Sequence, residues 1–278
     1  FCLSRGLGDV YKRQGLISLP TDRVDAELIA HAPELRVISN YAVGYDNVDL
    51  GAAAARGIPV GHTPGVLTDA TADLTFALLL AAARQLPQST ASVAAGEWKT
   101  WDPRAFLGVE LAGTTLGIIG WGRIGQAMAQ RATGFGMHIA HTDSRSSAAA
   151  LDDLLARSDF VSLHCPLTEQ TRHLIDSPAL ERMKPTAFLI NTARGGIVDH
   201  HALADALSQH AIAGASLDVT EPEPIPLEHP LLRAPNLLLT PHIGSATTAA
   251  RQQMAELAVD NLLAGLAGQP MPHQVPWP

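Results

Sequence analysis

The chain has 278 residues, of which 46% are hydrophobic and 17% charged, and its formal net charge is −8 at pH 7. This length and apolar content suffice for two domains with cores of their own. No basic run offsets the negative charge, which disfavours nucleic acid and anionic membranes as partners and favours a small soluble ligand. Cys2 and Cys165 are the only cysteines, so we expect no metal centre, no disulfide framework and a cytoplasmic location.

Residues 1–14 are not expected to belong to the fold. Residues 4–14 show neither helical nor strand periodicity, and they resemble the in-frame translation of an adapter used in sequencing-library preparation. A native surface loop is the alternative interpretation. We therefore expect the fold to begin at Gly15.

From Gly15 the pattern alternates between strand and helix, which predicts a parallel sheet. The expected strands and the helices between them cover residues 15–19, 22–30, 35–39, 50–56 and 58–61. The loop 40–46 follows the second strand at its carboxyl end, which is where open α/β sheets bind ligands.

A long helix is predicted over residues 66–86, with Ala and Leu on nearly every face. Such a helix is expected to be buried on all sides, with a partner subunit as its natural cover. Residues 87–110 have a mixed sequence and are expected to form an arm.

Residues 116–125 are the most informative stretch, because a buried-strand run leads there into a G-x-G-x-x-G turn and a helical pattern. Gly120 permits the turn, Gly122 lets a pyrophosphate approach the backbone, and Gly125 lets the helix pack on the strand. A second strand, 137–142, ends at Asp143, where such units place a ribose-binding carboxylate. A purely structural glycine turn is the alternative.

Further strands and helices are predicted in the rest of the chain, at 151–156, 160–163, 187–191, 213–218, 237–240 and 254–266. Polar residues cluster after these strands, and the carboxyl ends of parallel strands form one ligand-binding edge. The predicted fold class is α/β, with two doubly wound parallel-sheet domains. We expect a Rossmann nucleotide-binding domain at 67–247 and a flavodoxin-like substrate domain at 15–66 and 248–278.

The substrate domain is expected to be truncated at its N-terminus. In a doubly wound sheet of order 2-1-3-4-5, the strand that begins at Gly15 is the third, so two strands and their helices are missing. The loss of a central strand would leave a bare edge. We expect the chain as given to bind dinucleotide weakly or to aggregate, with little turnover.

Arg194, Glu223 and His242 follow separate predicted strands. Each residue alone is more often structural than catalytic. Beside a dinucleotide turn, the three together fit hydride transfer to a 2-keto acid. Arg194 can form a fork to the carboxylate, His242 can donate the proton, and Glu223 would favour the imidazolium. The backbone N–H groups of Val43 and Gly44 could bind the other carboxylate oxygen.

The sequence resembles the D-isomer-specific 2-hydroxyacid dehydrogenase family, and within it the glyoxylate/hydroxypyruvate reductases. The resemblance runs from Gly15 to about residue 272 and is carried by residues 43–46, 120–125, 191–195, 217–224, 229–232 and 241–245. It implies that Arg194, Glu223 and His242 are catalytic. It also implies a homodimer in which Trp101 reaches into the partner's active site.

The resemblance implies two further sets of residues. Substrate would be bound by Val43, Gly44, Arg194 and the partner's Trp101, and Asp218 would bind the nicotinamide amide. The expected cofactor-binding residues are Gly120, Gly122, Arg123, Ile124, Gly125, Asp143, Cys165, Pro166, Thr171, Thr192, Ala193, Arg194, Asp218, His242 and Gly244. Trp121 replaces the usual Leu of this family's turn, and we expect it to face outward.

Several alternatives remain open. NADH is expected over NADPH because Asp143 would repel a 2′-phosphate, although Arg145 could neutralise that charge. Glyoxylate and hydroxypyruvate both fit as substrates. A 3-phosphoglycerate dehydrogenase is the alternative enzyme, and a dinucleotide-sensing corepressor of the same fold is the non-catalytic alternative. Formate dehydrogenase is disfavoured because Glu223 stands where that relative needs an amide.

Overall fold

The computed structural model describes residues 13–278, so the adapter-like segment lies outside the described residues except for its last two positions. The chain forms two compact units. The first unit contains the residues up to Leu67 together with Ala246–Pro278, and the second unit contains Thr68–Ser245.

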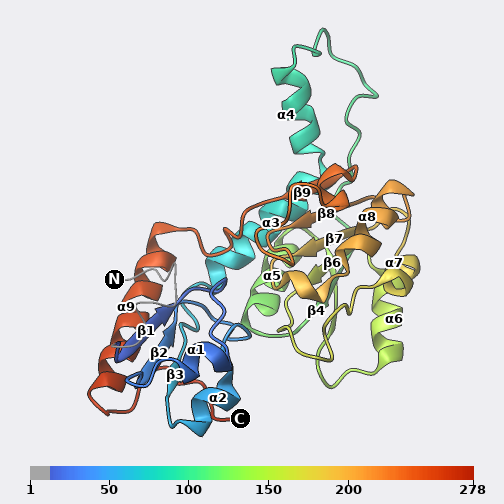
Figure 1. Ribbon diagram of the computed structural model, residues 1–278. Coiled ribbons are helices and arrows are strands. Elements are labelled where there is room, and N and C mark those ends of the chain that lie inside the picture. The colour runs from blue at the N-terminus through green and yellow to red at the C-terminus, as the bar shows by residue number, and fades with distance from the viewer. Residues whose placement is uncertain (1–12) are drawn as a thin grey trace. The chain divides into compact units, whose positions relative to one another are not determined.

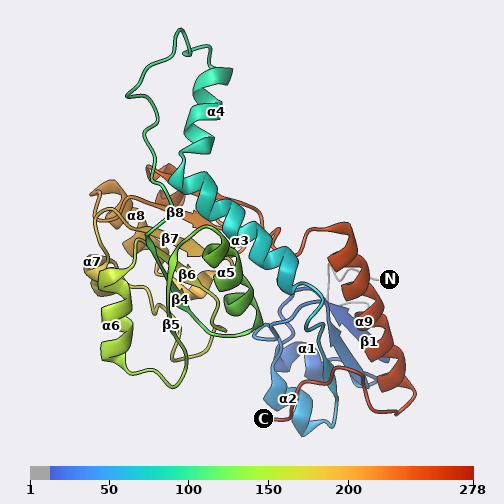
Figure 2. The same ribbon diagram turned by 180° about the vertical axis from the view of Figure 1, so that it is seen from behind.

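The first unit is a three-stranded parallel sheet of order β1-β2-β3. Its strands are β1 (Gly15–Ser18), β2 (Val37–Asn40) and β3 (Val60–Gly61). Helix α9 (Thr248–Leu266) lies against one face, whereas α1 (Ala26–Ala30) and α2 (Leu50–Ala55) cover the other (Figures 1 and 2). Within residues 13–278, β1 pairs on one side only.

Two helices of this unit begin at other residues than predicted. Helix α1 begins four residues late, because the carboxylate of Asp22 accepts a hydrogen bond from Leu19 N in a turn, and Asp25 caps the helix. Helix α9 begins six residues early, where the hydroxyl of Thr247 accepts from Ala250 N. Asp25 and Thr247 are both of residue types that commonly cap helices. The predicted starts at residues 22 and 254 did not make use of these caps.

The second unit contains a six-stranded sheet of order β5-β4-β6-β7-β8-β9, in which every pair of neighbours is parallel. Its strands are β4 (Thr115–Ile119), β5 (His138–Thr142), β6 (Phe160–Leu163), β7 (Phe188–Asn191), β8 (Gly214–Leu217) and β9 (Leu237–Leu239). All lie within two residues of their predicted bounds. The α/β class with parallel sheets is confirmed.

Helices cover both faces of this sheet (Figures 1 and 2). On one face, α3 (Thr68–Ala83) and α5 (Arg123–Gly134) enclose a core around Phe76, Ile118 and Met128. The opposite core includes Leu154, Leu189 and Leu203. Its helices are α6 (Ala148–Arg157), α7 (Ser177–Arg182) and α8 (His200–Ser208), and short 3-10 turns precede α8 at η2 (Gly195–Ile197) and follow it at η3 (Pro230–Arg233). The prediction did not include α7 and α8.

The helix predicted over residues 66–86 has other ends in the structure, where α3 begins at Thr68. It ends at Ala83, because Gln85 takes a left-handed conformation with φ of 50°, and a separate helix α4 (Leu86–Ala94) follows. Within the described chain, Asp69 and Asp73 of α3 are exposed and both pair with Arg131 of α5. The chain alone therefore does not bury this helix on all sides, and its cover by a partner subunit stays a prediction. The helix therefore has one polar, exposed stripe.

The arm extends away from the sheet of its own unit (Figures 1 and 2). Helix α4 forms the first part of the arm. Several large apolar side chains of the helix and of the residues after it are exposed: Leu86, Val93, Trp98, Trp101, Phe106 and Leu107. Among the described residues, no helix has the length and apolar character needed to cross a membrane.

Candidate active site

The loops that follow the six strands of the second unit all leave from the same edge of its sheet, because every strand is parallel to its neighbours. They carry most of the residues predicted for the site: Gly120, Asp143, Cys165, Pro166, Thr192, Ala193, Arg194, Asp218, His242 and Gly244. The fold thus places residues from distant parts of the sequence at one edge.

The glycine-rich turn between β4 and α5 requires two of its glycines for packing. Gly120 has φ of +104°, and a Cβ there would lie 2.4 Å from Cys165 N. A Cβ at Gly125 would lie 2.2 Å from the carbonyl oxygen of Gly120. These distances explain the close contact between helix and strand.

Gly122 differs, because a Cβ there would have no described protein atom within 4 Å. Gly122 is the N-cap of α5 and provides no side-chain cap, and Arg123 and Ile124 open the helix. The first N–H groups of a helix have no partner within the helix and attract anions. The turn therefore fits a dinucleotide pyrophosphate. Trp121, expected to face outward, is partly buried and stacks on His141 with ring centroids 3.9 Å apart.

Asp143 follows β5 and is bound by its own loop. Arg145 Nη2 donates to Asp143 Oδ2 at 2.8 Å, and Arg145 N donates to Asp143 Oδ1 at 2.9 Å. The side-chain hydrogen bond from Arg145 lowers the pKa of the Asp143 carboxyl. Asp143, the residue expected to bind a ribose, is thus paired with Arg145, the residue that could bind a 2′-phosphate.

The loop after β6 is held together by a hydroxyl. Thr171 Oγ1 donates to the carbonyl oxygen of Pro166 at 2.7 Å and accepts from Thr168 N at 2.8 Å. Burial lowers the pKa of His164 to about 4 and raises the pKa of the Cys165 thiol to about 11. Both side chains are therefore neutral at physiological pH.

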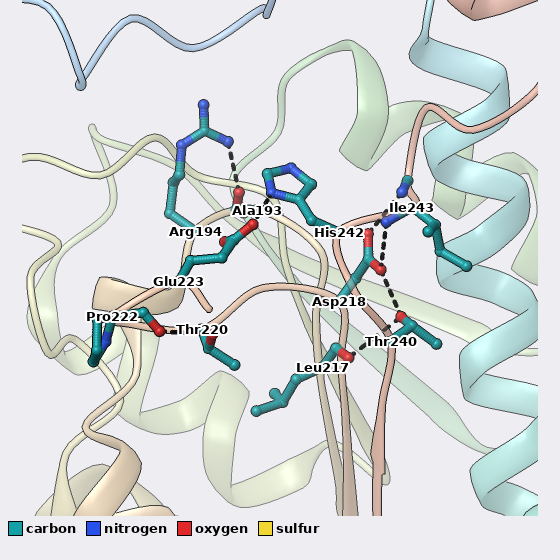
Figure 3. A network of polar contacts seen from close by, with 11 residues as sticks. Ala193, Arg194, Leu217, Asp218, Thr220, Pro222, Glu223, Thr240, His242 and Ile243 are labelled. Carbon is teal, nitrogen blue, oxygen red and sulfur yellow. Dashed lines mark hydrogen bonds and ion pairs between the residues drawn. The ribbon is translucent and has the colours of Figure 1, made fainter. Parts of the chain in front are cut away.

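Glu223 and His242 lie in direct contact, 19 residues apart in sequence (Figure 3). His242 Nδ1 and Glu223 Oε1 are 2.6 Å apart, and both side chains are partly buried. Arg194 extends from a neighbouring loop to the same side as the imidazole, with Nη1 donating to the carbonyl oxygen of Ala193 at 2.8 Å (Figure 3). The three residues predicted to carry the chemistry therefore lie in adjacent loops. The peptide bonds before Pro222 and Pro224 are cis.

The Arg194 turn is positioned by Asn191, the last residue of β7. Asn191 Nδ2 donates to the carbonyl oxygen of Arg194 at 2.8 Å, and Asn191 Oδ1 accepts from Ala193 N at 3.0 Å. The hydroxyl of Thr192 lies 2.7 Å from that of Thr75 in α3, and both are buried. The turn is thus anchored to a strand on one side and a helix on the other.

Val43 and Gly44 belong to the first unit, in the loop after β2. The carbonyl oxygen of Val43 lies 2.8 Å from His62 Nδ1, and that of Gly44 accepts from Asn40 Nδ2 at 2.8 Å. These contacts use the carbonyl groups and define the path of the loop. Trp101 lies in the arm and is 79% exposed.

Sequence reasoning missed four contributors to this edge of the sheet. Thr240 and Asn191 hold loops by hydrogen bonds, Arg172 pairs with Glu221 at 2.8 Å, and His200 is buried beside the Glu221 backbone. Asn at a strand end before a turn is a recognisable signal, because its side chain bonds to nearby backbone. The other three depend on contacts between distant segments.

Comparisons with known proteins find similar sequences and structures. A family model for the D-isomer specific 2-hydroxyacid dehydrogenase NAD binding domain matches residues 76–244. A glyoxylate reductase of Thermococcus litoralis is 51% identical, over 97% of this chain and 85% of that protein.

Two crystal structures are similar over nearly the whole chain. The TT0316 protein of Thermus thermophilus has 50% identity and a TM-score of 0.91, covering 97% of this chain and 88% of that chain. An NADPH-dependent glyoxylate/hydroxypyruvate reductase of Sinorhizobium meliloti, in complex with NADP and malonate, has 36% identity and a TM-score of 0.85, covering 96% and 85%.

Proposed function

Because the chain belongs to the D-isomer specific 2-hydroxyacid dehydrogenase family, we propose that it reduces glyoxylate to glycolate, which is achiral, or hydroxypyruvate to the D-isomer of its 2-hydroxy acid. As a member of this family it is an oxidoreductase that uses a nicotinamide cofactor. The observation that carries the proposal is the 2.6 Å contact between His242 Nδ1 and Glu223 Oε1, with Arg194 beside it.

The contact with Glu223 gives the two nitrogens of the His242 ring different roles. Nδ1 faces Glu223, so Nε2 is the nitrogen that can donate a proton to the carbonyl oxygen of a keto acid. Glu223 holds the ring in one orientation and stabilises its positive charge. The nicotinamide supplies the hydride. The guanidinium of Arg194 would then bind the substrate carboxylate, because its planar fork of donors suits that group.

The role of Val43 and Gly44 is also part of the proposal. Their N–H groups would bind the other oxygen of the substrate carboxylate, because successive backbone N–H groups form anion-binding sites. We therefore assign substrate binding to the first unit, at residues 15–66 and 248–278, and cofactor binding to residues 67–247.

NADH is the proposed cofactor, with NADPH as a second possibility. A carboxylate at Asp143 favours ribose hydroxyls over a 2′-phosphate. The guanidinium of Arg145 is paired with that carboxylate, so its positive charge already interacts with Asp143. The Sinorhizobium meliloti relative is NADPH-dependent, which is why both cofactors belong in the test.

The proposed assembly is a homodimer in the cytoplasm. The exposed apolar side chains of the arm, with Trp101 and Trp98 among them, are a surface of the kind that protein partners cover. The use of only two cysteines supports a reducing compartment.

Initial rates with four acids test the function, measured on a version in which the upstream strands expected from the sequence are restored: glyoxylate, hydroxypyruvate, pyruvate and phosphohydroxypyruvate, each with NADH and NADPH. We expect the first two with NADH to be fastest. A preference for phosphohydroxypyruvate would instead support the 3-phosphoglycerate dehydrogenase alternative. NADH binding without turnover of any of the acids would support the corepressor alternative.

Replacement of His242 tests the assigned chemistry. We expect His242→Ala to reduce kcat by about 10²-fold or more, because general acid catalysis contributes roughly that much. His138→Ala is the control, since His138 begins strand β5 at the end opposite to the site and is exposed. Equal kcat values for the two variants would contradict the assignment.

A further inference from the structure

The turn that carries His242 has an unfavourable backbone conformation. His242 has φ of +54°, in the left-handed region that a side chain with Cβ rarely occupies. Such a conformation persists only where surrounding contacts determine it. The contacts that hold this turn therefore decide where the imidazole points.

Those contacts converge on one residue, Asp218, at the end of β8 (Figure 3). Its Oδ1 accepts from Ile243 N at 2.8 Å and from Thr240 Oγ1 at 2.5 Å. Its Oδ2 accepts from Gly244 N at 2.7 Å, and its main-chain carbonyl oxygen accepts from His242 N at 2.8 Å. Four donors on the segment from Thr240 to Gly244 thus bond to this single residue.

Asp218 is itself firmly placed. It is 1% exposed, and its own N–H donates to the carbonyl oxygen of Asn191 at 2.8 Å, which extends the pairing of β8 with β7. A buried carboxylate is costly unless it is well bonded, and here two backbone N–H groups and one hydroxyl bond to it. Three of its roughly four acceptor positions are already used within the protein.

We infer that Asp218 is a positioning residue that acts with Thr240 to hold the His242 turn in its left-handed conformation. The inference rests on the proposed role of His242 as proton donor. It gives Asp218 a task besides the recognition of a nicotinamide amide, and it gives Thr240 a role in the reaction. The carboxylate sets the direction of His242 through the backbone of Ile243 and Gly244, without touching the imidazole.

Two substitutions separate this task from cofactor recognition. Asp218→Asn replaces one acceptor oxygen with an amide N–H, which would face a backbone donor. Thr240→Val removes one bond to the carboxylate and keeps the side-chain shape. Thr133→Val is the matched control, because Thr133 Oγ1 donates to Ala129 O within α5 and the variant also loses one hydroxyl bond.

We expect Thr240→Val to reduce kcat about tenfold while the dissociation constant of NADH stays within twofold, and Thr240→Ser to restore kcat. Thr133→Val should leave both unchanged. Loss of NADH affinity in Thr240→Val at unchanged kcat would overturn the inference, and so would a kcat equal to that of the unsubstituted protein.

Amide hydrogen exchange provides a test that needs no turnover. In the absence of cofactor, we expect the amides of Ile243 and Gly244 to exchange at least tenfold faster in Asp218→Asn, and at the original rate in Thr133→Val. Unchanged protection of these amides in Asp218→Asn would overturn the inference that Asp218 holds the turn. If instead the unsubstituted protein turns over no keto acid while this difference in exchange is found, the proposed function fails, and the inference that Asp218 holds the turn stands.

Discussion

Three glycines, two before the start of α5 and one at its end, provide a way to separate folding from cofactor binding. Gly120 has φ of +104° and no space for a side chain, whereas a Cβ at Gly122 meets no described atom within 4 Å. Gly134, the last residue of α5, also has open space and no positive φ. Alanine at these three positions should therefore give three different results.

The magnitudes follow from the contacts. At Gly120, a disallowed φ costs about 1–3 kcal/mol and the overlap with Cys165 N adds about 1–3 kcal/mol. A loss of about 4 kcal/mol would lower Tm by roughly 8–16 °C in a domain of this size. At Gly122, loss of a favourable N-cap costs at most about 1 kcal/mol. Gly134→Ala should change stability by less than about 1 kcal/mol, in the stabilising direction.

Cofactor affinity should follow a different order. Alanine at Gly122 places a methyl group where the pyrophosphate is proposed to approach the backbone, so we expect NADH affinity to fall at least tenfold, or about 1.4 kcal/mol. Thermal unfolding without cofactor and fluorescence titration with NADH measure the two effects. Unchanged NADH affinity in Gly122→Ala would refute the assignment of the turn, and an unchanged Tm in Gly120→Ala would refute the packing argument.

Three further predictions concern side chains at the same edge of the sheet. Burial lowers the pKa of His164 to about 4, below the value of about 6.5 in an unfolded chain, so its stabilising contribution is complete above pH 6.5 and is lost as pH falls towards 4. His164→Gln should remove this part of the pH dependence of unfolding, at most about 3 kcal/mol, and an identical pH profile would contradict it. Burial raises the pKa of Cys165 to about 11, so iodoacetamide at pH 8 should alkylate this thiol far more slowly than free cysteine. Mass spectrometry measures the rate, and a rate equal to that of free cysteine would contradict the burial. Glu223→Gln should lower kcat about tenfold or more at unchanged NADH affinity, because the amide no longer stabilises the imidazolium, and an unchanged kcat would argue against their coupling.

Sequence patterns located the strands of the second unit well, for a simple physical reason. Buried parallel strands are short apolar runs bounded by glycine or polar residues, and β4 and β6 follow that pattern. Helix ends were harder to predict. The break after α3 occurs at Gln85, a left-handed residue that is not glycine, and Pro87 was the only local signal of a new helix. Helix α8 was missed because two histidines obscure its apolar face, although Asp199 caps it.

The candidate site was predictable to the extent that it depends on residue type. Arg194, Glu223 and His242 were identified from their chemistry and from their positions after strands. The geometry that holds His242 was not predictable, because Asp218 bonds mainly to backbone N–H groups, which every residue except proline has. Only the fold determines which of those groups a carboxylate meets.

The division of the first unit between the two ends of the described chain affects the order in which the protein can fold during synthesis. Ser39 of β2 donates to the carbonyl oxygen of Ala258 in α9, 219 residues later. At about 5–20 residues per second, a ribosome needs roughly 10–45 s to cover that distance. The apolar face of β1 and β2 is not covered by α9 until that helix has been synthesised. The second unit is one continuous segment and can fold during this time. The described strands of the first unit are synthesised before the second unit, and their apolar face therefore stays uncovered until the second unit is complete.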